Sequence, residues 1–283
     1  MADIGRLSVG GGVAFWKPAE GTNHGILNTA LLRAGLEQFV PPKRTEASAL
    51  RGALEETFHG VKNVLIRGMK KPDIGFTVAN ERKGTAEDEW SGEQFLACHL
   101  RKNGERSHVE FKPWSYNGTN RITEVYANLF DTLPAASVTS MLVKILDDMG
   151  AVMLRESGGF YWIDETAFRV WERVTEAVES AGAFKVYLMK CIADEHMARA
   201  VTDSLIEEMD RTARRIERDV TSGELGEDAL TNRTKEALAA RERLAHFEGL
   251  FGVALEGVRA DMDKVTKAAA SCTLQAAAIA RGL

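Results

Sequence analysis

The stretch from Val186 to Val265 constrains the fold of this chain more than any other part, because apolar residues recur in it at helical spacing. The pattern runs on both sides of one turn sequence, Ser-Gly-Glu-Leu-Gly, at 222–226. Spacing by three and four residues is typical of two helices packed along one stripe. A short turn makes such helices antiparallel neighbours. The sequence therefore predicts a coiled-coil-like helical hairpin with arms of roughly 30 residues, about 45 Å long at 1.5 Å per residue.

We call the apolar stripe of this hairpin the seam. It consists of Val201, Leu205 and Ile216 in the first arm and Leu244, Phe247, Phe251 and Val258 in the second. A two-helix hairpin buries only one stripe, so it needs further helices from the same chain or from another subunit. Both packing within the chain and association between chains, with a second copy or with another helical protein, stay open. The Ala-rich tail at 266–283 can extend the second arm.

Composition limits the class of protein. With 283 residues, 45% of them hydrophobic and 27% charged, the chain resembles ordinary soluble proteins with two or three subdomains. It has no apolar run of membrane-spanning length, and its first residues lack the pattern of a secretory signal. Cys98, Cys191 and Cys272 lie far apart. We therefore expect reduced thiols, a cytoplasmic location, and neither disulfides nor a membrane partner.

Charge is unevenly distributed along the chain. Residues 186–265 hold 12 basic and 17 acidic residues, whereas the remainder holds 24 of each, so the hairpin carries the whole net charge of −5. A nucleic-acid clamp normally presents a positive face. Neither part of the chain meets that expectation as a whole, although a local basic patch is compatible with these averages.

The segments before the hairpin differ in periodicity, which predicts an α+β fold. Residues 1–60 contain a glycine loop, a short strand and two helices, the second capped by Thr45. Residues 61–118 alternate with a period of two and predict an antiparallel β meander with a tight turn at Asn103-Gly104. Residues 119–185 follow the order helix, hairpin, helix of a winged-helix-like unit. The helical hairpin and the tail occupy 186–283.

The winged-helix-like unit provides the one candidate for nucleic-acid contact. Its candidate residues are Lys144 and Arg155 for phosphates and Tyr161 and Trp162 for stacking on bases. Acidic residues, Asp147, Asp148 and Glu156, lie in the same segments and oppose contact with phosphates. Winged helices also bind proteins, so a packing or protein-binding role is the alternative.

No motif predicts a catalytic, cofactor or metal site. Gly10, Gly11 and Gly12 lack the lysine and hydroxyl of a phosphate-binding loop, which favours a flexible loop there. The six histidines are scattered, and Cys98-His99 with His108 supplies fewer ligands than a zinc site needs. No Ser-His-Asp set follows from spacing. An enzyme built from dispersed residues stays open, with no cofactor predicted.

Two segments resemble motifs of one family. Residues 41–55 (Pro-Pro-Lys-Arg-Thr-Glu-Ala-Ser-Ala-Leu-Arg-Gly-Ala-Leu-Glu) resemble its double-proline opening, and residues 156–163 (Glu-Ser-Gly-Gly-Phe-Tyr-Trp-Ile) resemble its Gly-Gly hairpin. Together they are similar to an uncharacterised family of proteins of about this length from bacteria, archaea and their phages. The resemblance implies a phage or mobile-element context and transfers no catalytic residue.

These observations favour a non-enzymatic, homo-oligomeric assembly or adaptor protein that uses the seam. A DNA-associated regulator using the winged-helix-like unit is the second hypothesis, and an enzyme without a recognisable motif is the third.

Overall fold

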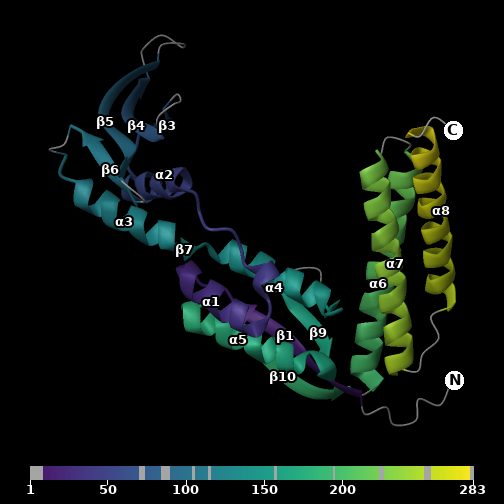
Figure 1. Cartoon of the computed structure of the whole chain (residues 1–283). Helices are drawn as coiled ribbons and strands as arrows, with labels where there is room; N and C mark the ends of the chain where they lie inside the picture. Colours follow the sequence, from purple (N-terminus) through teal and green to yellow (C-terminus); the bar gives the residue numbers. More distant parts are fainter. Residues whose placement is uncertain are drawn as a thin grey trace. The chain divides into compact units, whose positions relative to one another are not determined.

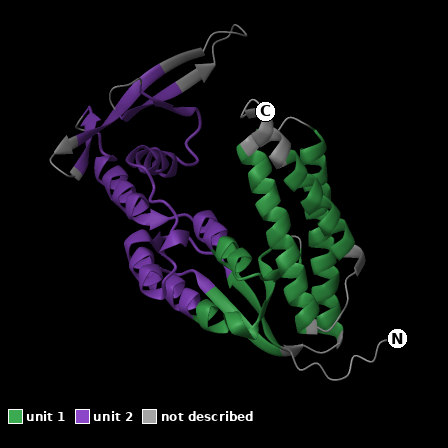
Figure 2. Ribbon diagram, turned by 45° about the vertical axis from the view of Figure 1, so that its right-hand side comes forward, with its two compact units in different colours: residues 1–16, 142–172, 186–283 green, residues 17–141, 173–185 purple. Residues whose placement is uncertain are grey.

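The chain folds into two compact units that are each built from separated parts of the sequence. The computed structural model describes residues 9–69, 74–83, 90–103, 106–113, 116–155, 158–193, 195–222, 226–251 and 256–280. Unit 1 comprises Met1–Trp16, Leu142–Glu172 and Val186–Leu283, and unit 2 comprises Lys17–Met141 and Arg173–Lys185 (Figure 2). Helices and antiparallel sheets occur together, which confirms the predicted α+β class.

Unit 2 contains the predicted meander and the helices packed on it. Its elements are β2 (Thr22–Asn23), α1 (His24–Ala34), η1 (Glu37–Phe39), α2 (Glu46–Thr57), β3 (Val64–Gly68), β4 (Gly75–Lys83), β5 (Trp90–Asn103), β6 (Arg106–Lys112), α3 (Thr119–Asp131) and β7 (Thr132–Leu133). The strands β3, β4, β5 and β6 pair in sequence order, each antiparallel to the next.

Local sequence explains several boundaries in unit 2. The hydroxyl of Thr45 accepts a hydrogen bond from the backbone N–H of Ser48 at 3.2 Å, so Thr45 caps α2 as predicted. Asn103 pairs with Arg106 across the predicted β5–β6 turn, whose residues 104 and 105 lie outside the described ones. Leu50 and Leu54 of α2, Ile122 of α3 and inward-facing strand residues form one buried cluster.

Unit 1 combines a second sheet with the C-terminal helices. Its elements are β1 (Val9–Lys17), β8 (Val152–Met153), β9 (Phe160–Asp164), η2 (Glu165–Ala167), β10 (Lys185–Ala193), α6 (Glu195–Thr221), α7 (Glu227–Phe251) and α8 (Glu256–Ala280); α4 (Ala135–Asp148) and α5 (Phe168–Ala181) contribute residues to both units. The strand order is β10-β1-β9-β8. The expected helix–hairpin–helix order is present as α4, β8–β9 and α5, but the hairpin is part of this larger sheet.

The glycine run at 10–12 is strand, so the prediction of a flexible loop was wrong. A Cβ on Gly11 would lie 2.4 Å from Cζ2 of Trp162, and a Cβ on Gly12 would lie 2.8 Å from the carbonyl oxygen of Met189. Side chains at these positions would collide with the neighbouring strands. The glycines therefore permit close approach of β1 to its sheet, a requirement set by residues about 150 positions away.

The second arm of the predicted hairpin is two helices, α7 and α8. Figure 1 shows α6, α7 and α8 side by side, and contacts join every pair of them. The prediction of one continuous second arm was therefore wrong, because 3/4 spacing records which face is buried and carries no information on where the chain reverses. Side chains of Phe251 and Val258 lie outside the described residues.

Candidate functional site

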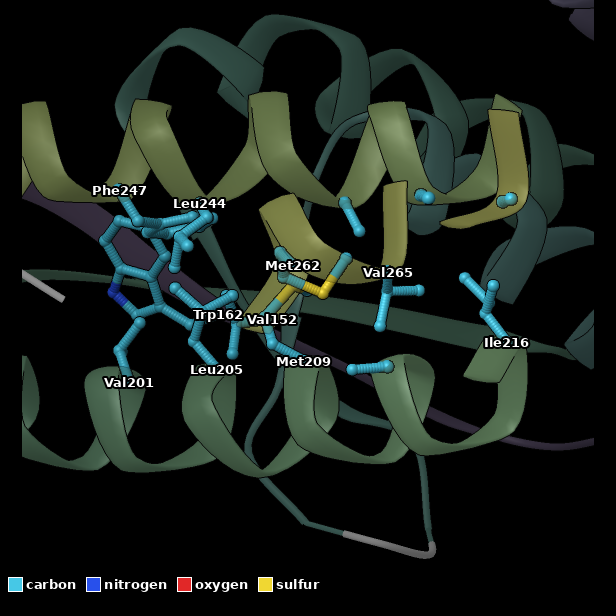
Figure 3. Packing of buried hydrophobic residues seen from close by; sticks show 14 residues of the cluster. Val152, Trp162, Val201, Leu205, Met209, Ile216, Leu244, Phe247, Met262 and Val265 are labelled. Carbon is cyan, nitrogen blue, oxygen red and sulfur yellow. The ribbon is translucent and has the colours of Figure 1, made fainter. Parts of the chain in front are cut away.

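The described seam residues lie in the core of unit 1. Val201, Leu205 and Ile216 of α6 and Leu244 and Phe247 of α7 are at most 2% exposed. Figure 3 shows α8 contributing Met262 and Val265 to the same cluster, and the sheet contributing Trp162 and Val152.

The seam is thus covered from within the chain. Its covering residues come from α8 and from β8 and β9, all of which belong to unit 1. An apolar stripe that is already dry offers no further apolar area to a partner. An interaction surface has to be sought elsewhere.

The four candidates for nucleic-acid contact are divided by burial. Trp162 is 0% exposed and lies 5.8 Å from the ring of Phe247, while Tyr161 is 4% exposed and stacks on Trp16 at 5.7 Å. Neither ring is accessible to a nucleic-acid base, which corrects their assignment as stacking residues. Their alternation on β9 places each in a protein core, one on either face of the sheet. Lys144 and Arg155 are exposed.

A cleft of about 770 Å³ opens in unit 1 between the end of α4, η2, α6 and α7. Carboxylates dominate its lining: Asp147, Asp148, Asp164, Glu208, Glu236 and Glu242. The basic residues that line it are Arg215, Arg243 and His246. No pattern in the sequence predicts this cleft, because its residues come from distant segments, such as Gly150 and Arg243, 93 positions apart, and Asp164 and His246, 82 positions apart.

Asp164 and His246 form a hydrogen-bonded pair at the edge of the cleft. Nε2 of His246 lies 3.1 Å from Oδ2 of Asp164, and Oδ1 accepts hydrogen bonds from the backbone N–H of Thr166 at 2.7 Å and from the Thr166 hydroxyl. Burial alone would raise the pKa of Asp164, but the hydrogen bonds from Thr166 and His246 and the charge of His246 lower it below its usual value. The imidazole itself is 53% exposed.

Arg243 joins α7 to α6 and to the end of α4. Its guanidinium forms an ion pair with Glu208, with one N–O distance of 3.1 Å, and donates to the carbonyl oxygens of Gly150, at 3.3 Å, and Ala151. These carbonyls belong to residues that connect the end of α4 to β8. Arg243 and Glu208 also act on Asp147 of α4. Its burial raises the pKa of its carboxyl, while the positive charge of Arg243 lowers this pKa and the negative charge of Glu208 raises it. The contacts of Arg243 therefore fix the helices against the sheet layer.

The residues that line the cleft offer acid–base and cation-binding chemistry. With Nε2 on Asp164, Nδ1 of His246 faces away from that carboxylate and is the atom that would exchange a proton. In the described part of the chain, no three His, Cys, Asp or Glu side chains are grouped as metal ligands. Among the described helices, none is long and apolar enough to cross a membrane.

A second surface lies on the sheet of unit 1, on the face that also carries Trp162. Phe15 of β1 stacks on Tyr187 of β10 at 5.0 Å and lies 6.1 Å from Phe160 of β9. Tyr187 is 41% exposed and Met189, two residues further along β10, is 54% exposed. We call Phe15, Phe160, Tyr187 and Met189 the aromatic face. The expectation that the helical hairpin begins at residue 186 was wrong, because β10 (Lys185–Ala193) is a strand and α6 begins only at Glu195.

Comparison with known proteins gives a match to one protein family. No curated protein and no solved structure matches the chain. A protein-family model matches residues 17–279, nearly the whole chain, and confirms the expected resemblance to an uncharacterised family. The chain therefore belongs to the family of unknown function DUF6744.

Proposed function

We propose that the protein is a non-enzymatic assembly protein that associates with copies of itself through the aromatic face. The observation that carries this proposal is the exposure of Tyr187 and Met189 side by side on β10, the strand at one end of its sheet. Exposed apolar side chains on an end strand are a liability for a protein that stays monomeric. The phage or mobile-element context and the cytoplasmic location belong to the same proposal.

The seam has a different role in this proposal from the one expected from the sequence. It stabilises unit 1 internally, and the assembled state uses the opposite end of the sheet from β8, the strand that contacts α6. Association between chains and packing within the chain are then carried by different residues. A substitution can therefore weaken association between chains without weakening packing within the chain, and the reverse.

Light scattering coupled to size-exclusion chromatography, over a range of loading concentrations, tests the proposal. We expect a mass that rises above the 31.1 kDa of one chain as concentration increases. Tyr187→Glu should hold the mass at one chain. Leu238→Glu is the matched control, because Leu238 is 42% exposed but lies on α7. A wild-type mass of 31.1 kDa at every concentration would contradict the proposal.

The Asp164–His246 pair favours a second candidate, an enzyme that uses His246 as a general base on a cationic substrate. The cleft lining holds six carboxylates against two arginines and one histidine, and this excess of negative charge favours a cation. Thermal unfolding with a panel of cationic metabolites tests it: a ligand should stabilise the wild type and lose its effect in Asp164→Asn. A panel without any stabilising ligand would count against this candidate.

The DNA-associated regulator now rests on Lys144 and Arg155 alone. Carboxylates at Asp147 and Asp148 lie just beyond Lys144 on the same helix, where they would repel phosphates. Absorbance at 260 nm across the chromatographic peak tests this alternative in the same experiment. Salt-sensitive excess absorbance that is lost in a Lys144→Glu/Arg155→Glu variant would restore it.

A further inference from the structure

Positive charge gathers in the meander of unit 2. The strands β3, β4, β5 and β6 hold seven basic and three acidic residues, a net charge of +4. The remainder of the chain holds 29 basic and 38 acidic residues, a net charge of −9. One sheet of an otherwise acidic protein therefore has the charge that attracts an anionic partner.

The register of this sheet places exposed charges on one of its faces. Paired residues of neighbouring strands share a face, and successive residues of a strand alternate between faces. Leu96 and Cys98 of β5 belong to the buried cluster with α2 and α3, so Ala97, His99 and Arg101 lie on the opposite face, which we call the outer face. Strand pairing extends the outer face to its neighbours, and all of its charged or titratable residues named here are at least partly exposed: Arg67, Arg101, His108, Glu110 and Lys112.

Cations are spread across the width of the outer face. Arg67 of β3 pairs with Thr77, Thr77 pairs with Ala97, and Ala97 pairs with Lys112 of β6. The Cα atoms of Arg67 and Lys112 are therefore about 14 Å apart, at about 4.8 Å per strand. Cations distributed over such a width suit a chain of phosphates better than one small anion.

Glu110 lies among these cations and reports their effect. Nε of Arg101 donates a hydrogen bond to Oε2 of Glu110 at 3.0 Å. This hydrogen bond holds the pKa of Glu110 below its usual value, and the positive charges of Arg101, Lys112 and His99 lower it further. Both partners of the Arg101–Glu110 ion pair are exposed, and exposed ion pairs are weak. A phosphate group can therefore compete with Glu110 on this face.

The outer face continues into a hollow of about 500 Å³ beside β6. Lys112 and Glu110 line the hollow from β6, and Thr119 and Asn120 line it from α3. Hydroxyl and amide side chains are common partners of phosphate oxygens in complexes with nucleic acids. The hollow thus places polar side chains and space next to the ammonium group of Lys112.

We propose that the outer face binds the phosphate backbone of duplex nucleic acid without sequence preference. Contact with phosphates needs cations and little apolar surface, whereas a protein partner needs an apolar centre to its interface. Among the side chains described on the outer face, none belongs to phenylalanine, tyrosine or tryptophan, the residues on which the bases of single strands stack. This surface is separate from Lys144 and Arg155 of the winged-helix-like unit.

Fluorescence anisotropy with labelled DNA duplexes of two unrelated sequences tests the proposal. The full chain is titrated into each duplex at several salt concentrations, and both duplexes should bind with similar, salt-sensitive affinity. Lys112→Ala should weaken binding several-fold and reduce the slope of log K against log salt by about 1, because one phosphate contact is lost. Arg51→Ala is the matched control, since it removes an exposed cation of α2, the helix packed on the other face of the sheet.

A second variant should strengthen binding, which a folding defect does not explain. Glu110→Gln removes a negative charge from the outer face and should raise the affinity for both duplexes several-fold. Glu55→Gln is its matched control, because Glu55 is the carboxylate of the exposed Arg51–Glu55 pair on α2. Circular dichroism of all four variants establishes that each is folded.

The proposal fails if neither duplex binds at about 50 mM salt. It also fails if Lys112→Ala and Glu110→Gln both bind like the wild type. Tighter binding of a single strand of the same sequence, or equal competition by polyglutamate, would replace duplex nucleic acid with another class of partner. Loss of binding in Lys144→Glu/Arg155→Glu but not in Lys112→Ala would move the contact to the winged-helix-like unit. None of these outcomes bears on self-association, which light scattering measures separately.

Discussion

Replacing Phe247 by alanine tests whether the seam is part of the core of unit 1. The side chain is 2% exposed, and its ring lies 5.8 Å from Trp162 and 5.4 Å from His246. Removing a fully buried phenylalanine ring typically costs about 3–5 kcal/mol, because transfer free energy is lost and a cavity is left. We expect Phe247→Ala to lower the free energy of unfolding of unit 1 by about this amount.

Urea unfolding followed by circular dichroism measures the loss, since α6, α7 and α8 supply most of the helix in unit 1. Leu238→Ala is the matched control, because Leu238 lies on the same helix and is 42% exposed. Its loss should stay below about 1 kcal/mol, as for most exposed positions. A comparably small loss in Phe247→Ala would refute the assignment of this ring to the core.

Protein concentration supplies a second criterion for the same variant. A seam closed within one chain gives a loss of stability that is the same at every concentration, whereas a seam shared between subunits couples stability to concentration. We expect no such coupling in a Tyr187→Glu background, where β10 association is removed. A strong dependence there would show that the seam joins two chains.

Three further results follow from the described contacts. Gly11→Ala should destabilise unit 1 by about 1–3 kcal/mol in thermal or urea unfolding, because its Cβ would lie 2.4 Å from the indole of Trp162; a neutral change would contradict the packing of β1. The pKa of Asp164 is lowered in the folded state, so its contribution to stability is present above the ordinary value of 3.8 and is lost as pH falls through the lower folded value. Asp164→Asn should therefore lose less stability than the wild type between neutral pH and pH 3, a comparison made by urea unfolding at each pH; equal losses would argue against the contacts from Thr166 and His246. Burial raises the pKa of Cys98 to about 12, so its thiol should react with iodoacetamide far more slowly than a free cysteine until unit 2 unfolds, and mass spectrometry of the labelled peptide would expose a fast reaction as a contradiction.

Local signals in the sequence were sufficient for much of the fold. The meander follows from the period of two and from Asn103 at its last turn, and the start of α2 follows from Thr45. These features depend on neighbours along the chain. The buried faces of α6 and α7 were also predicted, because apolar residues recur at helical spacing within each helix. Val201 and Leu205 belong to this pattern in α6, and Leu244 belongs to it in α7.

Features that depend on distant residues could not be predicted in this way. Glycines 10–12 lack strand propensity, and the reason for Gly11, the indole of Trp162, is visible only after β1 and β9 pair. The Asp164–His246 pair joins residues 82 positions apart, with no spacing rule to connect them. The point at which the chain reverses between α7 and α8 was missed because the apolar period continues across it.

Amide hydrogen exchange of the wild type, compared between dilute and concentrated solutions, tests the central claim most directly. The claim is that the seam is used within the chain and that association takes place at β10. We predict that concentration slows exchange in peptides covering Lys185–Ala193 and leaves exchange in α6 and α7 unchanged. Slower exchange in α6 and α7, with none in Lys185–Ala193, would contradict the account and return the seam to the interface between chains.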